Sequence, residues 1–275
     1  MLNKVFSYLR DKGLRSTLTY ILARFNFLVS PPETPGELRA RLARDLSCQL
    51  NHTVIAGLFT GLIMQPQATW GTGDRASHLL GTYEQEVQDI ISTYGESYAC
   101  LIDVGAADGY YAVGCMLKHL FEHCHAFEVV DRSRLNIRYL AELNQVSAAV
   151  TLHGAATSES LASLPLACRN NAFILMDIEG GEFDLLTHAV IRHFNHAFFV
   201  VELHPFAHPA GPSAVNNLRD RFRSTHETWT VGQGPRDPGQ FDILRHLHDN
   251  ERWLLVSENR GQWMEWLIAK PWGGS

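Results

Sequence analysis

The stretch LIDVGAADGYYAVG, residues 101–114, carries the pattern that decides the fold. A short apolar run contains Asp103, and a loop of small residues follows with Gly105, Ala107 and Gly109 at alternate positions. A helix-like segment comes next. Such a loop permits a tight turn after a strand and brings the free N–H groups of a helix start against a ligand. The loop alone is also compatible with an ordinary strand-to-helix turn.

An acid near the next apolar run points to a nucleotide ligand. Glu128 lies 19 residues after Gly109, where an acid can bind both hydroxyls of a ribose. Asp103 would repel a pyrophosphate but suits a ligand with an ammonium group. S-adenosylmethionine (SAM) has a ribose, an ammonium and a sulfonium and no phosphate. The loop therefore favours SAM over NAD, and Ala107 at the middle glycine position also disfavours an NAD-dependent oxidoreductase.

From about residue 97 onward, apolar runs alternate with helix-like stretches, which is typical of a parallel α/β sheet. We expect parallel strands at 99–105, 125–131, 148–156, 171–180 and 196–206, and helices at 110–121, 133–146, 182–194 and 214–226. The segments 227–232 and 264–272 predict an antiparallel pair that finishes the sheet.

Composition limits the class of protein. The chain has 275 residues, 45% of them hydrophobic, and a formal charge of −6. It therefore has no global basic character of the kind that nucleic-acid binders carry, and we expect no nucleic-acid partner. The cysteines are odd in number and form no CxxC pair: Cys48, Cys100, Cys115, Cys124 and Cys168. This pattern predicts reduced thiols in a cytoplasmic protein, with neither a disulfide framework nor a structural zinc site.

The N-terminal segment is basic and amphipathic. Residues 1–28 carry five Lys/Arg against one acid, with apolar residues at roughly helical spacing. The favoured interpretation is a helix that packs on its own domain or on a partner subunit of a homodimer, and the alternative is contact with a membrane surface. We expect three regions: an amphipathic helix and linker (1–36), a helical cap (37–96) and a SAM-binding Rossmann-like catalytic domain (97–275).

Acids and a histidine occur where two of the predicted strands end. Asp177 follows the fourth apolar run, and Glu202 and His204 follow the fifth. The carboxyl ends of parallel strands face one crevice, so these side chains should lie near the SAM site. Two carboxylates and an imidazole are a credible set of ligands for Mg²⁺, Mn²⁺ or Fe²⁺. Without a metal, His204 or His226 is the expected general base.

Several of these motifs together resemble a known family. The loop, FEVVD (127–131), ILMDIEGGEFDLL (174–186) and FFVVELHPF (198–206) are similar to FkbM-type class I SAM-dependent methyltransferases. GTYEQEV (81–87) is similar to the Gly-x-Tyr-Glu stretch of that family and implies a cofactor role for Glu84. The resemblance implies a Rossmann-like sheet, mostly parallel with an antiparallel last strand, and methyl transfer that is usually to oxygen.

The sequence thus predicts a SAM-dependent O-methyltransferase that acts on a small-molecule or sugar hydroxyl. Tyr111, directly after the loop, and Ala155, at the end of the third predicted strand, complete the expected cofactor-binding set. Asp177, His204 and His226 are the expected catalytic residues. Two alternatives stay open: a SAM enzyme with other chemistry, such as cyclisation, and a non-catalytic SAM-binding protein. A polar cluster at 258–260 is compatible with binding an acceptor carboxylate or with capping a helix.

Overall fold

The computed structural model describes residues 13–18, 21, 33–66 and 73–273. The chain divides into two compact units, residues 1–42 and 43–275, and each is described by itself. Within the first unit, residues 13–18 are helical, and α2 (Pro35–Gln49) begins there. Most of the predicted amphipathic helix and linker lies outside the described residues. None of the helices in the described part of the chain combines the length and the apolar character needed to cross a bilayer.

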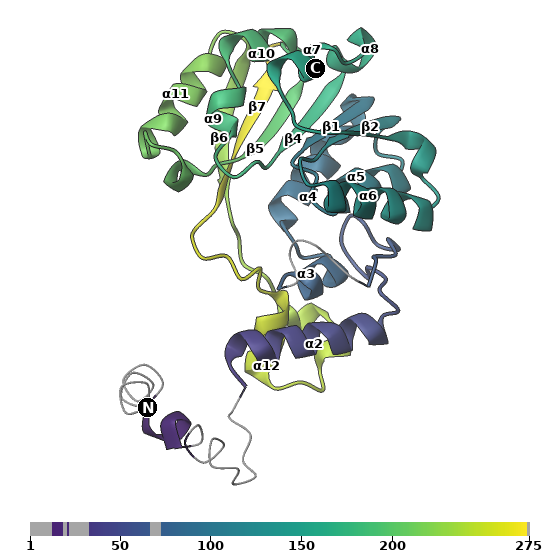
Figure 1. Ribbon diagram of the computed structural model, residues 1–275, viewed down its shortest axis with the longest axis vertical. Coiled ribbons are helices and arrows are strands. Elements are labelled where there is room, and N and C mark those ends of the chain that lie inside the picture. Colours follow the sequence, from purple (N-terminus) through teal and green to yellow (C-terminus); the bar gives the residue numbers. More distant parts are fainter. Residues whose placement is uncertain (1–12, 19–20, 22–32, 67–72, 274–275) are drawn as a thin grey trace. The chain divides into compact units, whose positions relative to one another are not determined.

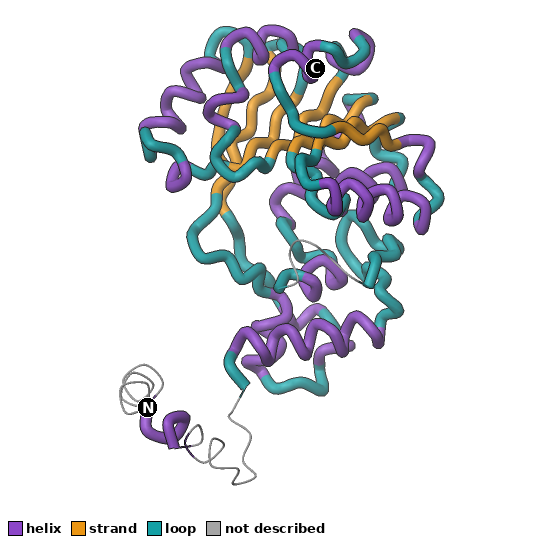
Figure 2. The backbone as a smooth tube through the Cα atoms, viewed as in Figure 1, coloured by secondary structure: helices purple, strands orange, loops and turns teal. Residues whose placement is uncertain are grey.

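A mixed sheet forms the centre of the second unit (Figure 1, Figure 2). Its strands in the described residues are β1 (Cys100–Val104), β2 (His123–Phe127), β3 (Val150–His153), β4 (Ala172–Met176), β5 (Phe198–Glu202), β6 (His226–Gly232) and β7 (Glu265–Pro271). The order is β3-β2-β1-β4-β5-β7-β6, and β7 is antiparallel to both of its neighbours. The predicted Rossmann-like sheet with an antiparallel last strand is therefore confirmed. The order reverses between β1 and β4, and a crevice forms at such a point.

Helices cover both faces of this sheet. They include α4 (Gln85–Tyr94), α5 (Tyr110–Leu117), α6 (Asp131–Leu143), α10 (His188–His193) and α11 (Pro212–Phe222). Residues of α4, α5 and α6 share a core with Phe173 and Trp266 on one face. Residues of α10 and α11 share a second core with Phe199 on the other face, and Figure 1 shows the two groups on opposite sides of the strands. Because both faces are covered, β1, β4 and β5 are buried at every position.

The segment 182–194, predicted as a single helix, differs from expectation. It folds as α9 (Glu182–Leu185) followed by α10. Leu186 leaves the helical conformation with a ψ of 64°, and the Thr187 hydroxyl then caps α10 by accepting a hydrogen bond from Val190 N at 3.3 Å. A threonine that caps a helix start competes with helix continuation, so the apolar spacing alone did not reveal the break.

The cysteine prediction is wrong for two residues. Cys100 and Cys168 form a disulfide, whereas Cys48, Cys115 and Cys124 are free. The bridge joins the start of β1 to α8 (Leu166–Arg169), the short helix that precedes β4. β4 is the neighbour of β1 in the sheet, so the fold brings together two residues 68 positions apart. Spacing along the sequence could not indicate that proximity.

Candidate functional site

The carboxyl ends of β1, β2, β4 and β5 open into one cavity of about 710 Å³, a size typical of ligand pockets. The predicted site residues that line it are Glu84, Asp103, Gly105, Ala107, Tyr111, Glu128, Ala155, Asp177, Glu202 and His204. The sheet thus brings residues more than 100 positions apart in the sequence to one cavity. We expected this for residues at the carboxyl ends of parallel strands. Gly109 and His226 are the predicted residues that do not line it.

The glycine loop approaches the end of β4 closely. Gly105 has a φ of +89°, and a Cβ at this position would lie 1.7 Å from the carbonyl oxygen of Asp177. Any other residue would therefore clash and be strained. Gly109 has a different role, because a Cβ there would meet Ile137 of α6 at 3.1 Å. It permits α5 and α6 to pack closely and makes no part of the cavity wall.

Glu128 is held in one orientation just beyond β2. Its Oε2 accepts a hydrogen bond from Ala107 N at 2.9 Å, and its Oε1 accepts one from Val130 N at 2.7 Å. The residue is 7% exposed and lines the cavity. Each carboxylate oxygen of Glu128 can accept a further hydrogen bond. The carboxylate can therefore accept one hydrogen bond from each of two vicinal hydroxyls.

Asp103 places an incompletely satisfied carboxylate beneath the loop. It is 3% exposed, it lines the cavity, and its Oδ2 has no hydrogen-bond partner among the described residues. Burial, together with the nearby carboxylates of Glu128 and Glu84, raises the pKa of Asp103 to about 7. A buried acid without a partner for one oxygen is costly, and a cationic group of a ligand would remove that cost.

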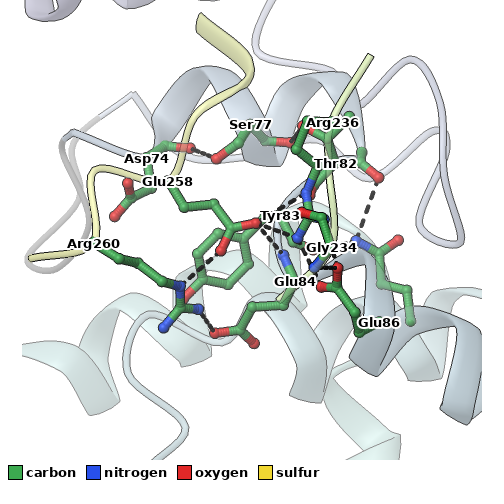
Figure 3. A network of polar contacts seen from close by, with 12 residues as sticks. Asp74, Ser77, Thr82, Tyr83, Glu84, Glu86, Gly234, Arg236, Glu258 and Arg260 are labelled. Atoms are coloured by element: carbon green, nitrogen blue, oxygen red, sulfur yellow. Dashed lines mark hydrogen bonds and ion pairs between the residues drawn. The ribbon is translucent and has the colours of Figure 1, made fainter. Parts of the chain in front are cut away.

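A network of ion pairs crosses the cavity wall (Figure 3). The guanidinium of Arg260 pairs with Glu84 and Glu202, each at 2.5 Å, and with Glu258 at 2.8 Å. Its carbon also lies 5.4 Å from the ring centre of Trp266. Three carboxylates already engage this cation, so binding an acceptor carboxylate, one of the roles considered for the 258–260 cluster, is not favoured.

A second arginine fastens the C-terminal segment to α4. Arg236 pairs with both oxygens of Glu86, at 2.6 and 2.7 Å, and with Glu258 at 2.5 Å (Figure 3). Its Nε also donates to the carbonyl of Thr82 at 2.7 Å. The guanidinium is thereby satisfied although Arg236 is only 7% exposed. The loop that follows β6 is thus anchored beside Glu84. Arg260 comes from a later segment, between α12 (Asp249–Val256) and β7.

The three residues of the predicted metal set lie near one another, because Asp177 and His204 both act on the carboxyl of Glu202. Glu202 is paired with Arg260, whereas donor atoms of Asp177, Glu179 and His204 all lie within 4.8 Å of one another. Asp177 Oδ1 is a buried atom without a hydrogen-bond partner in the described residues, and His204 Nε2 lies 3.6 Å from it. Glu179 is therefore a further donor beside Asp177 and His204, whereas Glu202 is also held by Arg260.

The surroundings of His204 define its charge. Nδ1 lies 3.4 Å from Oε1 of the buried Glu182, and Nε2 faces Asp177 and Glu179. Burial lowers the pKa of His204, but the neighbouring carboxylates, Glu182 foremost, outweigh burial and raise it to about 9. With no cation between these groups, the ring is an imidazolium and serves as an ion-pair partner rather than a proton acceptor.

His226, the other predicted base, lies elsewhere. It begins β6, is 1% exposed, and pairs with Pro271 of β7, whereas Glu202 pairs with Trp266 at the other end of β7. Its Nε2 lies 3.0 Å from the carbonyl oxygen of Ala197. The residue is therefore at the edge of the sheet opposite the cavity, where it satisfies buried backbone.

Two cavity residues on α3 (Arg75–Leu80) were missed by sequence reasoning. Arg75 is 8% exposed, and its guanidinium lies 3.3 Å from Ser47 Oγ and 3.4 Å from His52 Nδ1. Asp108 acts on it electrostatically, but Arg75 makes no ion pair in the described residues. His78 is stacked on Tyr83, with 3.9 Å between ring centres. Both line the cavity. No motif marks RASHLL, so the sequence offered no signal for either.

His78 is a neutral ring. Its Nδ1 lies 2.8 Å from the carbonyl oxygen of Asp74 and so carries the proton, which leaves Nε2 as an acceptor. Burial lowers the pKa of His78 to about 4, with Arg75 and Arg260 as further causes. At neutral pH the cavity therefore contains an imidazole that can accept a hydrogen bond.

No family model and no curated protein matches this chain, so membership of the FkbM family stays a prediction. Among solved structures, a human methyltransferase 10 domain containing protein is 14% identical, with a TM-score of 0.47 over 84% of this chain and 96% of that one. Precorrin-6y C5,15-methyltransferase from Geobacter metallireducens is 14% identical, with a TM-score of 0.43 over 67% and 87%.

A third solved structure, precorrin 8w decarboxylase from Methanobacterium thermoautotrophicum, is 12% identical, with a TM-score of 0.43 over 67% of this chain and 89% of that one. Likeness at this level of identity and TM-score carries no functional inference. The function must be argued from the cavity itself.

Proposed function

We propose that this chain is a SAM-dependent methyltransferase. The observation that carries the proposal is Glu128, fixed by Ala107 N and Val130 N at the edge of the cavity with acceptor capacity left on both oxygens. The 2′- and 3′-hydroxyls of a ribose are the donors that such a carboxylate binds in nucleotide sites at this place in the fold. The adenosine half of the cofactor would then lie over the ends of β1 and β2.

Other residues of the cavity suit a zwitterion. Asp103 offers a carboxylate oxygen for the α-ammonium of SAM, and Arg75 offers a buried guanidinium without an ion pair in the described residues for the α-carboxylate. Glu84 lies near Asp103, but its two oxygens already engage Arg260 and Tyr111. Charge-assisted hydrogen bonds of this kind are the stronger ones in proteins. A carboxylate for the ammonium and a guanidinium for the carboxylate together fit the methionine part of SAM.

A dinucleotide is disfavoured by charge. The acids that line the cavity are Asp74, Glu84, Asp103, Asp108, Glu128, Asp177, Glu179, Glu202 and Glu258, against the cations Arg75, Arg260 and His204. A pyrophosphate at the glycine loop would meet Asp103 and Asp108. The same negative charges attract the sulfonium and ammonium of SAM. The charge of the cavity wall therefore favours SAM over NAD, although both contain an adenosine.

We place the methyl acceptor beside Asp177 and His78, which line the cavity together with Tyr83 and Phe206. A small molecule or sugar with a free hydroxyl fits the mixture of aromatic walls and hydrogen-bond acceptors. His78 Nε2 would accept a hydrogen bond from that hydroxyl and orient its lone pair toward the sulfonium methyl. Transfer is then an in-line displacement, in which alignment supplies most of the acceleration.

We further propose that Asp177, Glu179 and His204 hold a divalent cation. The donor set is oxygen-rich with one imidazole, which suits Mg²⁺, Mn²⁺ or Fe²⁺. The contact of His204 Nδ1 with Glu182 resembles the carboxylate–histidine pairs that orient metal ligands. A bound dication would lower the pKa of an acceptor hydroxyl and orient it. In this proposal Glu202 is not a metal ligand, and its role is to hold Arg260 in the cavity wall by an ion pair.

The two alternatives make different use of the same cavity. A SAM enzyme with other chemistry would keep every cofactor contact and differ in its product. A non-catalytic SAM-binding protein would have no need for Asp177, Glu179 and His204 to converge, and that convergence favours an enzyme.

Calorimetry with SAM, S-adenosylhomocysteine and NADH tests the proposal. We expect stoichiometric binding of the first two and none of NADH. Binding of NADH without SAM would overturn the assignment of the cavity. Incubation with SAM labelled at the methyl group and a panel of hydroxylated compounds, with product analysis by mass spectrometry, then separates methyl transfer from the alternatives.

A further inference from the structure

Three donor side chains for a soft or borderline metal ion meet near the start of the sheet. Cys100 begins β1, Cys168 lies in α8, and His125 lies in β2. In the sheet register His125 is level with Ile102. Cys100 is two residues before Ile102 and so projects to the same face. All three residues are buried, and their donor atoms lie within 4.8 Å of one another.

The orientation of His125 is set by a second histidine. Its Nδ1 lies 3.0 Å from Nε2 of His153 in β3, and His153 stacks on Phe127 with 4.4 Å between ring centres. One nitrogen of His125 is therefore engaged, which leaves Nε2 free for ligation. Metal-binding histidines characteristically have their second nitrogen fixed in this way.

We propose that Cys100, Cys168 and His125 form a redox-controlled zinc site. In the described structure the two sulfurs are joined and the site is closed. A dithiol reductant opens it: the disulfide takes up two electrons and two protons, and the dithiol becomes a disulfide. Binding of Zn²⁺ then releases the two thiol protons. Two thiolates and one imidazole leave a fourth tetrahedral position for water or another ligand.

This site is separate from the cavity. Cys100 lies at the amino end of β1, whereas Asp103 and Gly105 lie at its carboxyl end, and none of Cys100, His125 and Cys168 lines the cavity. The chemistry of the two donor sets also differs, because thiolates select Zn²⁺ or Cu⁺ and carboxylates select Mg²⁺ or Mn²⁺. A disulfide that only fastens β1 to α8 would have no need for an oriented imidazole beside the sulfurs.

Cobalt titration of the full-length protein tests the proposal, because Co²⁺ reports thiolate ligation by its sulfur-to-metal charge-transfer absorption. The protein is reduced with dithiothreitol without air, freed of reductant and titrated. We expect the band to saturate at one equivalent of Co²⁺ and to disappear when Zn²⁺ is added. The untreated, disulfide-bonded protein should show no band. This comparison needs no substitution and therefore does not depend on the folding of a variant.

Variants locate the ligands. Cys168→Ser should abolish the band, and His153→Ala should weaken Co²⁺ binding roughly 10–100-fold, the usual effect of removing such a partner. Cys48→Ser, which removes an exposed free cysteine, and Asp177→Asn are the matched controls and should leave the band unchanged. A reduced protein without the band, a band that survives Cys168→Ser, or a disulfide that resists dithiothreitol in the folded protein would each overturn the proposal.

Discussion

The backbone N–H of Ala107 donates a hydrogen bond to Oε2 of Glu128 at 2.9 Å. This bond joins the glycine loop after β1 to the first acid after β2. The loop and Glu128, the two parts of the proposed cofactor site, are therefore held together without a ligand. Ala107 reaches the bond with a φ of 47°, a conformation that non-glycine residues rarely adopt. The orientation of Glu128 is thus a property of the loop as well as of the strand.

Arg75 should recognise the carboxylate of the cofactor. Arg75→Ala should weaken binding of S-adenosylhomocysteine by roughly 10–150-fold, because a charge-assisted hydrogen bond contributes about 1.5–3 kcal/mol. Binding of 5′-methylthioadenosine, which lacks the amino acid end, should be unchanged. Calorimetry with both ligands separates recognition from folding: an equal loss for both would mean that Arg75 has only a structural role. Arg132→Ala, at an exposed position, is the control.

SAM affinity should depend on pH through Asp103. Its raised pKa of about 7 means that the group is mostly neutral at pH 6, whereas the ammonium of SAM binds the ionised form. SAM should therefore bind about tenfold more weakly at pH 6 than at pH 8. Binding near pH 7 should release protons, which calorimetry in buffers of different ionisation enthalpy detects. 5′-Methylthioadenosine should show no such dependence, and a parallel pH dependence for that ligand would contradict the role of Asp103.

The sequence predicted the features that local patterns encode. Continuous apolar runs predicted the parallel strands, and the glycine loop and Glu128 do line one cavity, whereas their role in cofactor binding stays a prediction. Contacts between distant segments were not predictable: Arg260 and Glu84 are 176 residues apart, and nothing in either segment indicates the other. The same is true of Cys100 with Cys168. The place of Glu179 beside Asp177 and His204 follows from the turn after β4.

Removal of a metal ligand should separate metal binding from SAM binding. Asp177→Asn and Glu179→Gln should each weaken Mn²⁺ binding and lower methyl transfer, because the proposed site has only three protein donors. SAM affinity should stay within a few-fold, since neither residue belongs to the proposed cofactor contacts. Mn²⁺ titration followed by electron paramagnetic resonance measures this, with Glu265→Gln, an exposed acid of β7, as control. Full methyl-transfer activity after the metal has been removed with EDTA would refute the proposal of a catalytic divalent cation.

Arg236 should matter for stability. Arg236→Met leaves Glu86 without its bidentate partner and removes a donor to Glu258, and loss of one member of a buried network typically costs about 3–5 kcal/mol. Urea denaturation followed by circular dichroism measures the change in the free energy of unfolding. Arg252→Ala breaks an exposed pair with Asp249 and should change that free energy by less than about 1 kcal/mol. Similar values for the two variants would show that the network is not stabilising.

Calorimetric titration of Glu128→Ala with S-adenosylhomocysteine tests the central claim most directly. The substitution removes both proposed ribose contacts, and the loss of a charge-assisted pair should weaken binding by roughly 1.5–3 kcal/mol, or about 10–150-fold. Glu142→Ala, an exposed acid on α6, is the matched control and should bind as the unmodified protein does. If Glu128→Ala and Glu142→Ala bind the ligand equally well, or if the unmodified protein does not bind it, the cavity is not a SAM site.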